Sequence, residues 1–174
     1  CEQLISLAKI NLNAVVFPAN LTGLNALSCF PLPNTTPSNT GYATLNGVNI
    51  LNGNFCNLSA SYTDQTVATC TGSYKIFRTW RVYDWCLNNI FVEATQIIEV
   101  LDKTPPVVQA PADMTVSTSA SDCFADIVLA PAGITEDCST SWTVRTEGPF
   151  GTMQTNGEPV NILPVGIHSF IYNA

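Results

Sequence analysis

Charged side chains are scarce in this sequence. Asp, Glu, Lys and Arg make up 11% of its 174 residues, and only six of them are basic. Ordinary soluble domains carry about 25% charged residues. Scattered basic residues in such small number cannot form the positive stripe that holds phosphates, so we exclude nucleic acid as a partner. The net charge of −7 keeps the chain soluble and permits binding of hard cations.

Long apolar runs are also missing. The longest apolar patches, such as 97–101, have the length of a strand and include a charge. A membrane helix needs about 18 or more apolar residues, so no membrane span is expected. No basic segment precedes an apolar one near the start, so any secretion signal is expected to have been removed.

The sequence contains few side chains that could carry out catalysis. The one histidine, His168, lies in a predicted strand beside Ile167 and Phe170, where a structural or exposed role is expected. A nucleophile activated by histidine would need this residue. Glu136 and Asp137 are adjacent, which is more typical of a solvated loop than of the carboxylate pair of a glycosidase. The sequence therefore predicts that the protein is not an enzyme.

Closely spaced cysteine pairs, which zinc sites require, are absent as well. The seven cysteines lie at positions 1, 29, 56, 70, 86, 123 and 138. Without CxxC pairs, disulfides in an oxidising compartment are the better interpretation of these residues.

Helix signals are nearly absent, and short alternating apolar runs between Gly, Pro, Asn and Asp predict strands throughout. In the first half we expect strands at 4–17, 48–50, 57–67, 73–85 and 92–101. The strand 73–85 has apolar side chains at both parities, which is typical of a central strand in a sandwich, and Trp80 is expected in its core.

The segment Asp102-Lys-Thr-Pro-Pro106 is predicted to separate two domains, because its prolines remove strand donors and stiffen an extended backbone. Beyond it we expect strands at about 112–119, 124–130, 141–146, 158–162 and 166–173. The predicted fold is all-β, with two tandem immunoglobulin-like β-sandwich domains at 1–102 and 107–174 joined by the linker 103–106. A seven-stranded sandwich needs one strand more, so the second domain is expected to lack its last strand.

The second domain carries four segments in a characteristic order. They are DKTPPV at 102–107, PADMTV at 111–116, EDCS at 136–139 and LPVGIHS at 163–169. In this order they resemble a hyalin (HYR-type) repeat, whose closing Asp-x-x-Gly-Asn turn and last strand are missing here.

The second half of the first domain is similar to related immunoglobulin-like repeats of large secreted bacterial surface proteins, especially of the Bacteroidetes group. The segments that carry this resemblance are FRTW at 77–80, VYDWC at 82–86 and TQIIEV at 95–100. The usual Cys-Gly-Asn turn is replaced by Cys86-Leu-Asn88, and residues 1–50 match no pattern.

These resemblances imply a secreted structural or adhesive repeat module of a cell-surface stalk, adhesin or filament, without catalytic activity. Its partners would be neighbouring copies, further domains of the same protein or surface glycans. The alternative function is a carbohydrate- or host-binding lectin-like module. A platform of Trp80, Trp85 and Trp142 would suit sugar stacking, unless two of the three are core residues. Trp142, near the start of a predicted strand, is the expected core tryptophan of the second domain.

The predicted strand directions suggest how the cysteines pair. Cys70 and Cys86 bracket one extended strand and would lie on the order of 50 Å apart, so they cannot bond to each other. We expect Cys56–Cys86 at one pole of the first domain and Cys29–Cys70 at the opposite pole. For Cys138 the partner is either Cys123 or a cysteine outside this sequence.

Two further sites are predicted near the domain ends. Asp102, Glu136 and Asp137 are placed at the linker pole, where their oxygens could hold Ca²⁺. The missing last strand would leave an assembly edge beside 166–173, with Ile167 or Phe170 exposed to a strand from a continuing chain or from a neighbouring subunit. Asn-x-Ser/Thr triplets at Asn20, Asn34 and Asn57 add little, because they arise by chance in such a sequence.

Overall fold

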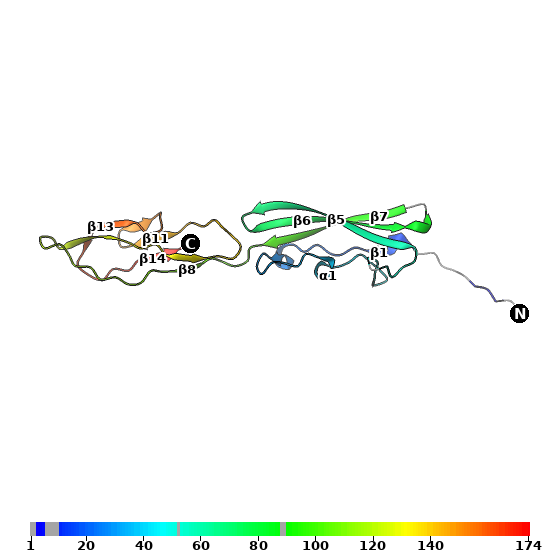
Figure 1. The fold of residues 1–174 in the computed structure, drawn as a ribbon, viewed down its shortest axis with the longest axis horizontal. Helices are drawn as coiled ribbons and strands as arrows, with labels where there is room; N and C mark the ends of the chain where they lie inside the picture. The colour runs from blue at the N-terminus through cyan, green and yellow to red at the C-terminus, as the bar shows by residue number, and fades with distance from the viewer. Residues whose placement is uncertain (1–2, 6–10, 52, 88–89) are drawn as a thin grey trace. The chain divides into compact units, whose positions relative to one another are not determined.

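The computed structural model describes residues 3–5, 11–51, 53–87 and 90–174. The chain is mostly strand, with 45% of residues in strands and 7% in helices, which confirms the predicted all-β class. It divides into two compact units, Cys1–Asp102 (unit 1) and Lys103–Ala174 (unit 2) (Figure 1). An immunoglobulin-like arrangement of the strands stays a prediction.

Unit 1 contains one large sheet with the strand order β2-β7-β6-β5. Its strands are β2 (Leu27–Ser28), β5 (Leu58–Cys70), β6 (Ser73–Asp84) and β7 (Ile90–Leu101). β5, β6 and β7 form a continuous antiparallel meander, whereas β2 runs parallel to the end of β7. The predicted strands 57–67, 73–85 and 92–101 are thus present.

The sharp turn between β5 and β6 depends on Gly72. Its φ is 74°, which glycine adopts without the strain that a Cβ would cause. The pairing register shifts between Ala68 and Cys70 at this turn. The chain therefore reverses at the Cys70-Thr-Gly72 segment, between the predicted strands 57–67 and 73–85.

The second layer of unit 1 is short and irregular. It contains η1 (Leu12–Ala14), β1 (Val15–Val16), η2 (Gly23–Asn25), α1 (Pro37–Thr40), β3 (Thr44–Leu45) and β4 (Val48–Asn49). β1, β3 and β4 form a small sheet, and Figure 1 shows β1 and α1 beneath the large sheet.

The core of unit 1 lies between these two layers. Its buried residues are Leu12, Ala43, Leu45, Ile50, Leu58, Ala60, Trp80 and Val82. Because side chains alternate along a strand, the even-numbered residues of β6 point into this core and the odd-numbered ones point out. Trp80 has no exposed surface, which confirms its predicted place in the core.

Unit 2 is built from three small sheets. β8 (Val107–Gln109) pairs with β10 (Gly133–Thr135), and β9 (Phe124–Val128) pairs with β13 (Pro159–Pro164). The third sheet contains β11 (Arg145–Gly148), β12 (Gly151–Met153) and β14 (Ile171–Asn173), with β11 in the middle. The buried cluster of Ile127, Leu129, Val160 and Leu163 is its small core.

Two predicted strands are wrong. In the segment 4–17 the described residues form only η1 and β1, because the Asn11 side chain accepts a hydrogen bond from the Asn13 amide and starts a helical turn. Residues 6–10 lie outside the described residues. The segment 112–119 forms no strand and is exposed throughout, since the pairing of unit 2 begins earlier, at β8.

No helix in the described part of the chain is long and apolar enough to cross a membrane.

Candidate functional site

Three aromatic rings gather on the outer face of the large sheet of unit 1. Tyr83 and Phe91 lie directly opposite each other on β6 and β7, with ring centroids 5.5 Å apart. The Trp85 ring is nearly parallel to that of Tyr83 at 5.9 Å. Trp85 is 59% exposed and Phe91 is 48% exposed. We call these three residues the aromatic cluster.

A charged pair adjoins the aromatic cluster. Arg81 on β6 donates from Nε to the Glu93 carboxylate on β7, and its guanidinium lies over the Phe91 ring at 5.3 Å. The hydrogen bond to Glu93 raises the pKa of Arg81. Ser59 and Ser61 of β5 lie opposite Tyr83 and Arg81 on the same face. The surface therefore combines apolar rings with hydrogen-bonding groups at its edge.

The local sequence explains why Trp85 leaves the strand at this point. The buried carboxylate of Asp84 accepts a hydrogen bond from the Cys86 amide at 2.9 Å and from the Asn57 side chain at 3.4 Å. This bond begins η3 (Trp85–Leu87) directly after β6. The Trp85 amide still donates to the carbonyl of Asn57, the residue before β5, at 2.9 Å, so the Trp85 backbone stays anchored there.

The opposite face of the sheet holds a buried charge, Arg78. Its guanidinium donates to both carboxylate oxygens of Asp64 at 2.7 Å, to the Thr40 hydroxyl at 2.8 Å and to the Thr35 carbonyl at 2.7 Å. It also lies 4.4 Å from the centre of the Tyr62 ring. A buried charge is tolerated when it is paired and hydrogen-bonded in this way.

Gln96 connects the same sheet to the second layer. Its amide nitrogen donates to the carbonyls of Ala19 at 2.9 Å and Thr40 at 2.7 Å, and its oxygen accepts from the Trp80 indole at 3.3 Å. Arg78 and Gln96 are thus engaged in structural bonds. The part of unit 1 that offers side chains to a ligand is the outer face.

Unit 2 has two shallow hollows. One has a volume of about 230 Å³ and is lined by Phe150, Met153, Glu158 and Phe170. The other, of about 540 Å³, is lined by Asp122, Asp126 and Ile162. Both aspartates of the second hollow are engaged, because Asp122 accepts from the hydroxyls of two nearby serines and Asp126 accepts from the Ile162 amide.

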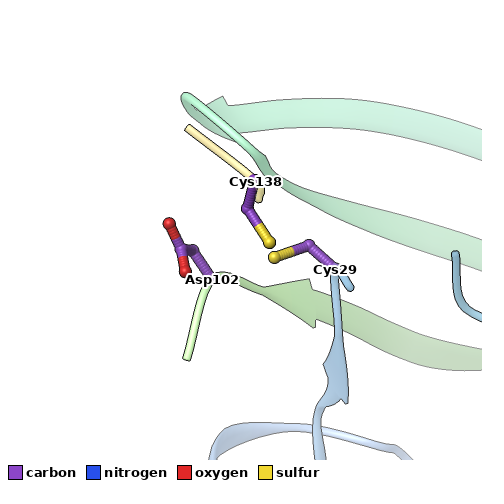
Figure 2. Close-up of side chains that lie close together, drawn as sticks. All are labelled: Cys29, Asp102 and Cys138. Carbon is purple, nitrogen blue, oxygen red and sulfur yellow. The ribbon is translucent and has the colours of Figure 1, made fainter. Parts of the chain in front are cut away.

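The cysteines pair differently from the prediction. Cys29 of unit 1 and Cys138 of unit 2 are the disulfide-bonded cysteines, and Figure 2 draws both side chains and that of Asp102. Cys56, Cys70, Cys86 and Cys123 are free and exposed. A disulfide is typical of an oxidising compartment.

The predicted pairs fail for geometric reasons. Cys56 and Cys86 do lie at the same end of the β5–β6 hairpin, but η3 turns the chain out of register with β5 before Cys86 can face Cys56. Cys29 follows β2 and Cys70 ends β5, with β7 and β6 between them. Three strand spacings amount to about 14 Å, twice the reach of a disulfide. The pair Cys123–Cys138 is wrong because Cys123 is a free cysteine.

Of the three predicted calcium ligands, Glu136 already accepts hydrogen bonds within its own loop. Glu136 is half-buried, and its carboxylate accepts hydrogen bonds from the amides of Asp137 and Cys138 at 2.9 and 3.1 Å, which closes its own loop. A calcium site of Asp102, Glu136 and Asp137 stays a prediction.

The three tryptophans do not form one platform. Trp80 is in the core, whereas Trp85 in unit 1 and Trp142 in unit 2 are 59% and 45% exposed. Trp142 was expected in the core of unit 2, and its exposure shows that this prediction is wrong. His168 is half-buried, and its Nε2 lies 2.8 Å from the Pro164 carbonyl oxygen, in keeping with a structural role.

The two residues of the predicted assembly edge, Ile167 and Phe170, differ in their exposure. The Ile167 side chain is fully exposed, whereas Phe170 is half-buried against the core cluster of unit 2. Residues 166–170 form no strand, and β14 begins only at Ile171. Whether a further strand adds there stays a prediction.

The sequence interpretation missed the aromatic cluster as a unit. The shared parity of Tyr83 and Trp85 was visible in the sequence, but their pairing with Phe91 depends on the register between β6 and β7. Comparisons with models of protein families, with curated proteins and with solved structures find no match to this chain.

Proposed function

We propose that this chain is an extracellular structural and adhesive module of a cell-surface stalk, adhesin or filament, and that it has no catalytic role. The observation that carries the proposal is the aromatic cluster on the outer face of the unit 1 sheet. Exposed Trp, Tyr and Arg side chains are the residue types that dominate binding energy at protein surfaces. Trp85, Tyr83 and Arg81 occur together there.

The interior supports a mechanical rather than a chemical role. The polar groups of Arg78 and Gln96 are used to fasten the second layer of unit 1 to its sheet. Cys29 and Cys138 are disulfide-bonded, a state that is typical of proteins outside cells. The segments of unit 2 that resemble a hyalin repeat support the same proposal of a secreted surface protein.

An adhesion assay with the whole chain tests this proposal. Beads coated with the protein are expected to attach to a mucin-coated surface, and Trp85→Ala should reduce attachment strongly. Leu24→Ala is the matched control, because Leu24 is a fully exposed apolar residue of η2 whose neighbour Gly23 bonds Glu99, far along β7 from Phe91 of the aromatic cluster. Equal attachment of the wild-type and Trp85→Ala chains would contradict an adhesive role for this surface.

A second candidate function is carbohydrate binding, which the same cluster favours. Aromatic rings pack against the apolar face of a sugar ring, while the neighbouring Arg81–Glu93 pair and the Ser59 and Ser61 hydroxyls could bond its hydroxyl groups. Calorimetric titration with cellohexaose and chitohexaose tests this candidate. If deglycosylated mucin still binds the beads and neither oligosaccharide does, the surface recognises protein rather than glycan.

A further inference from the structure

The longest free edge in the described part of the chain belongs to β5. It is the terminal strand of the order β2-β7-β6-β5 and pairs only with β6. Residues 63–70 are all exposed, so neither face of this half of the strand is covered. An edge strand of this length presents a row of unpaired N–H and C=O groups.

The hydrogen-bond pattern shows which residues carry these groups. The Trp85 amide donates to the Asn57 carbonyl, which makes Asn57 and Trp85 a hydrogen-bonded pair at the start of the ladder. Such pairs alternate with non-bonded ones along an antiparallel ladder, and the register is regular as far as Ala68. The backbone groups of Tyr62, Asp64, Thr66 and Ala68 therefore point away from β6, toward the free edge.

The usual protections of an edge strand are missing here. Natural edges carry lysine, proline or a bulge in mid-strand. Residues 62–70 read YTDQTVATC, and the register shift lies at the very end of the strand. The one charge, Asp64, is neutralised by its two hydrogen bonds from Arg78. This edge is thus available for pairing and brings no local repulsion despite the net charge of −7.

We propose that β5 is a strand-addition surface for a second copy of this chain, with the two β5 strands antiparallel about a two-fold axis at Gln65. In this register the backbone groups of Asp64 and Thr66 in one copy bond those of the partner's Thr66 and Asp64. The two Asp64 carboxylates are therefore not opposite each other. The β-branched Thr63 meets the partner's Val67, a favourable cross-strand pair. A two-fold contact of this kind consumes both free edges at once, so the assembly closes as a dimer.

This inference goes beyond the proposed adhesive function, and its tests do not involve the aromatic cluster. Failure of one proposal therefore leaves the other in place.

Cysteine cross-linking tests the register. In a chain whose other free cysteines and Cys1 are changed to Ser, Gln65→Cys should give an oxidised dimer on a non-reducing gel. Residues 65 of the two copies would form a non-bonded pair with Cα atoms about 4.5 Å apart, within the range of a disulfide. Thr63→Cys is the matched control, because its two copies would be roughly 14 Å apart. Equal cross-linking of both variants, or of neither, would overturn the proposal.

A proline substitution tests the backbone bonds by sedimentation velocity. Thr66→Pro removes an N–H that points to the free edge, so it spares the β5–β6 ladder. It should weaken the wild-type dimer roughly tenfold or more, whereas Thr66→Ala should keep it. Melting temperatures establish that both variants fold. A wild-type chain that stays monomeric at every accessible concentration, or a dimer unaffected by Thr66→Pro, would contradict the inference.

Discussion

Arg78 and Asp64 face each other across β6 and β5 and form two parallel hydrogen bonds, Nε to Oδ1 and Nη2 to Oδ2, each 2.7 Å long. The Arg78 side chain is only 1% exposed, whereas that of Asp64 is 32% exposed. The carboxylate at the sheet edge thus compensates a charge that lies inside unit 1.

Replacing Asp64 by Ala should therefore destabilise unit 1. The change leaves a buried guanidinium without its counter-charge, and we expect a loss of about 2–3 kcal/mol in the free energy of unfolding. Chemical denaturation measures it. Thr69→Ala, on the exposed end of the same strand, is the control and should have little effect. An equally stable Asp64→Ala chain would show that the pair does not support the core.

Truncation of Trp80 on β6 should reduce stability much more than truncation of Trp85 on η3. Trp80→Ala opens a cavity in the core and should cost about 3–5 kcal/mol. Trp85→Ala removes a ring that is 59% exposed and should change stability by less than about 0.5 kcal/mol. Thermal unfolding of both variants gives the comparison. Similar melting temperatures for the two would contradict the assigned core.

Glu99 should make stability depend on pH in the acid range. Its carboxylate bonds the Lys75 ammonium at 2.8 Å and the Gly23 amide at 2.8 Å, and these bonds lower its pKa below the ordinary 4.5. The folded state therefore binds this proton less readily than the unfolded state, so the stabilisation is complete above pH 4.5 and is lost as the pH falls through the folded pKa.

The control for this prediction is Glu99→Gln. The variant should melt at a lower temperature than the wild type at neutral pH, and the difference should shrink as the pH falls below 4.5. A difference that is constant between pH 7 and pH 3 would refute the linkage to Glu99.

Thiol accessibility should divide the cysteines into two classes. Iodoacetamide added to the native protein should modify Cys56, Cys70, Cys86 and Cys123 and leave Cys29 and Cys138 unmodified until a reductant is added. Peptide mass spectrometry reads out each position. If Cys56 and Cys86 resist alkylation before reduction and react after it, they form the disulfide that the sequence suggested.

The meander was predictable because its signals are local. Alternation in 73–84 and the glycine at position 72 are enough to place β6 and its turn. Even so, Arg78 interrupts the apolar parity of β6, and its role became visible only when Asp64, Thr35 and Thr40 were seen around it. Polar partners from distant segments leave no periodic pattern in a sequence.

The cysteine pairing and the core of unit 2 were harder to predict from the sequence for a different reason. Strand direction alone placed Cys56 and Cys86 at one pole, but the Asp84 side chain redirects the backbone between β6 and Cys86. Trp142 is large and apolar like a typical core residue, but Ile127 and Val160 fill the small core of unit 2. Size and hydrophobicity predict burial only where the neighbouring strands leave room.

The contiguity of β5, β6 and β7 has a kinetic consequence. Their pairings close only short stretches of chain, whereas the bonds from Gln96 to Ala19 and Thr40 close stretches of 77 and 56 residues. Short closures cost less entropy, so the meander should assemble first and the segment from Leu12 to Ile50 should dock onto it afterwards. In native-state hydrogen exchange the amides around Trp80 would then be the last to open, and the second layer would come away as a unit while the meander remains intact.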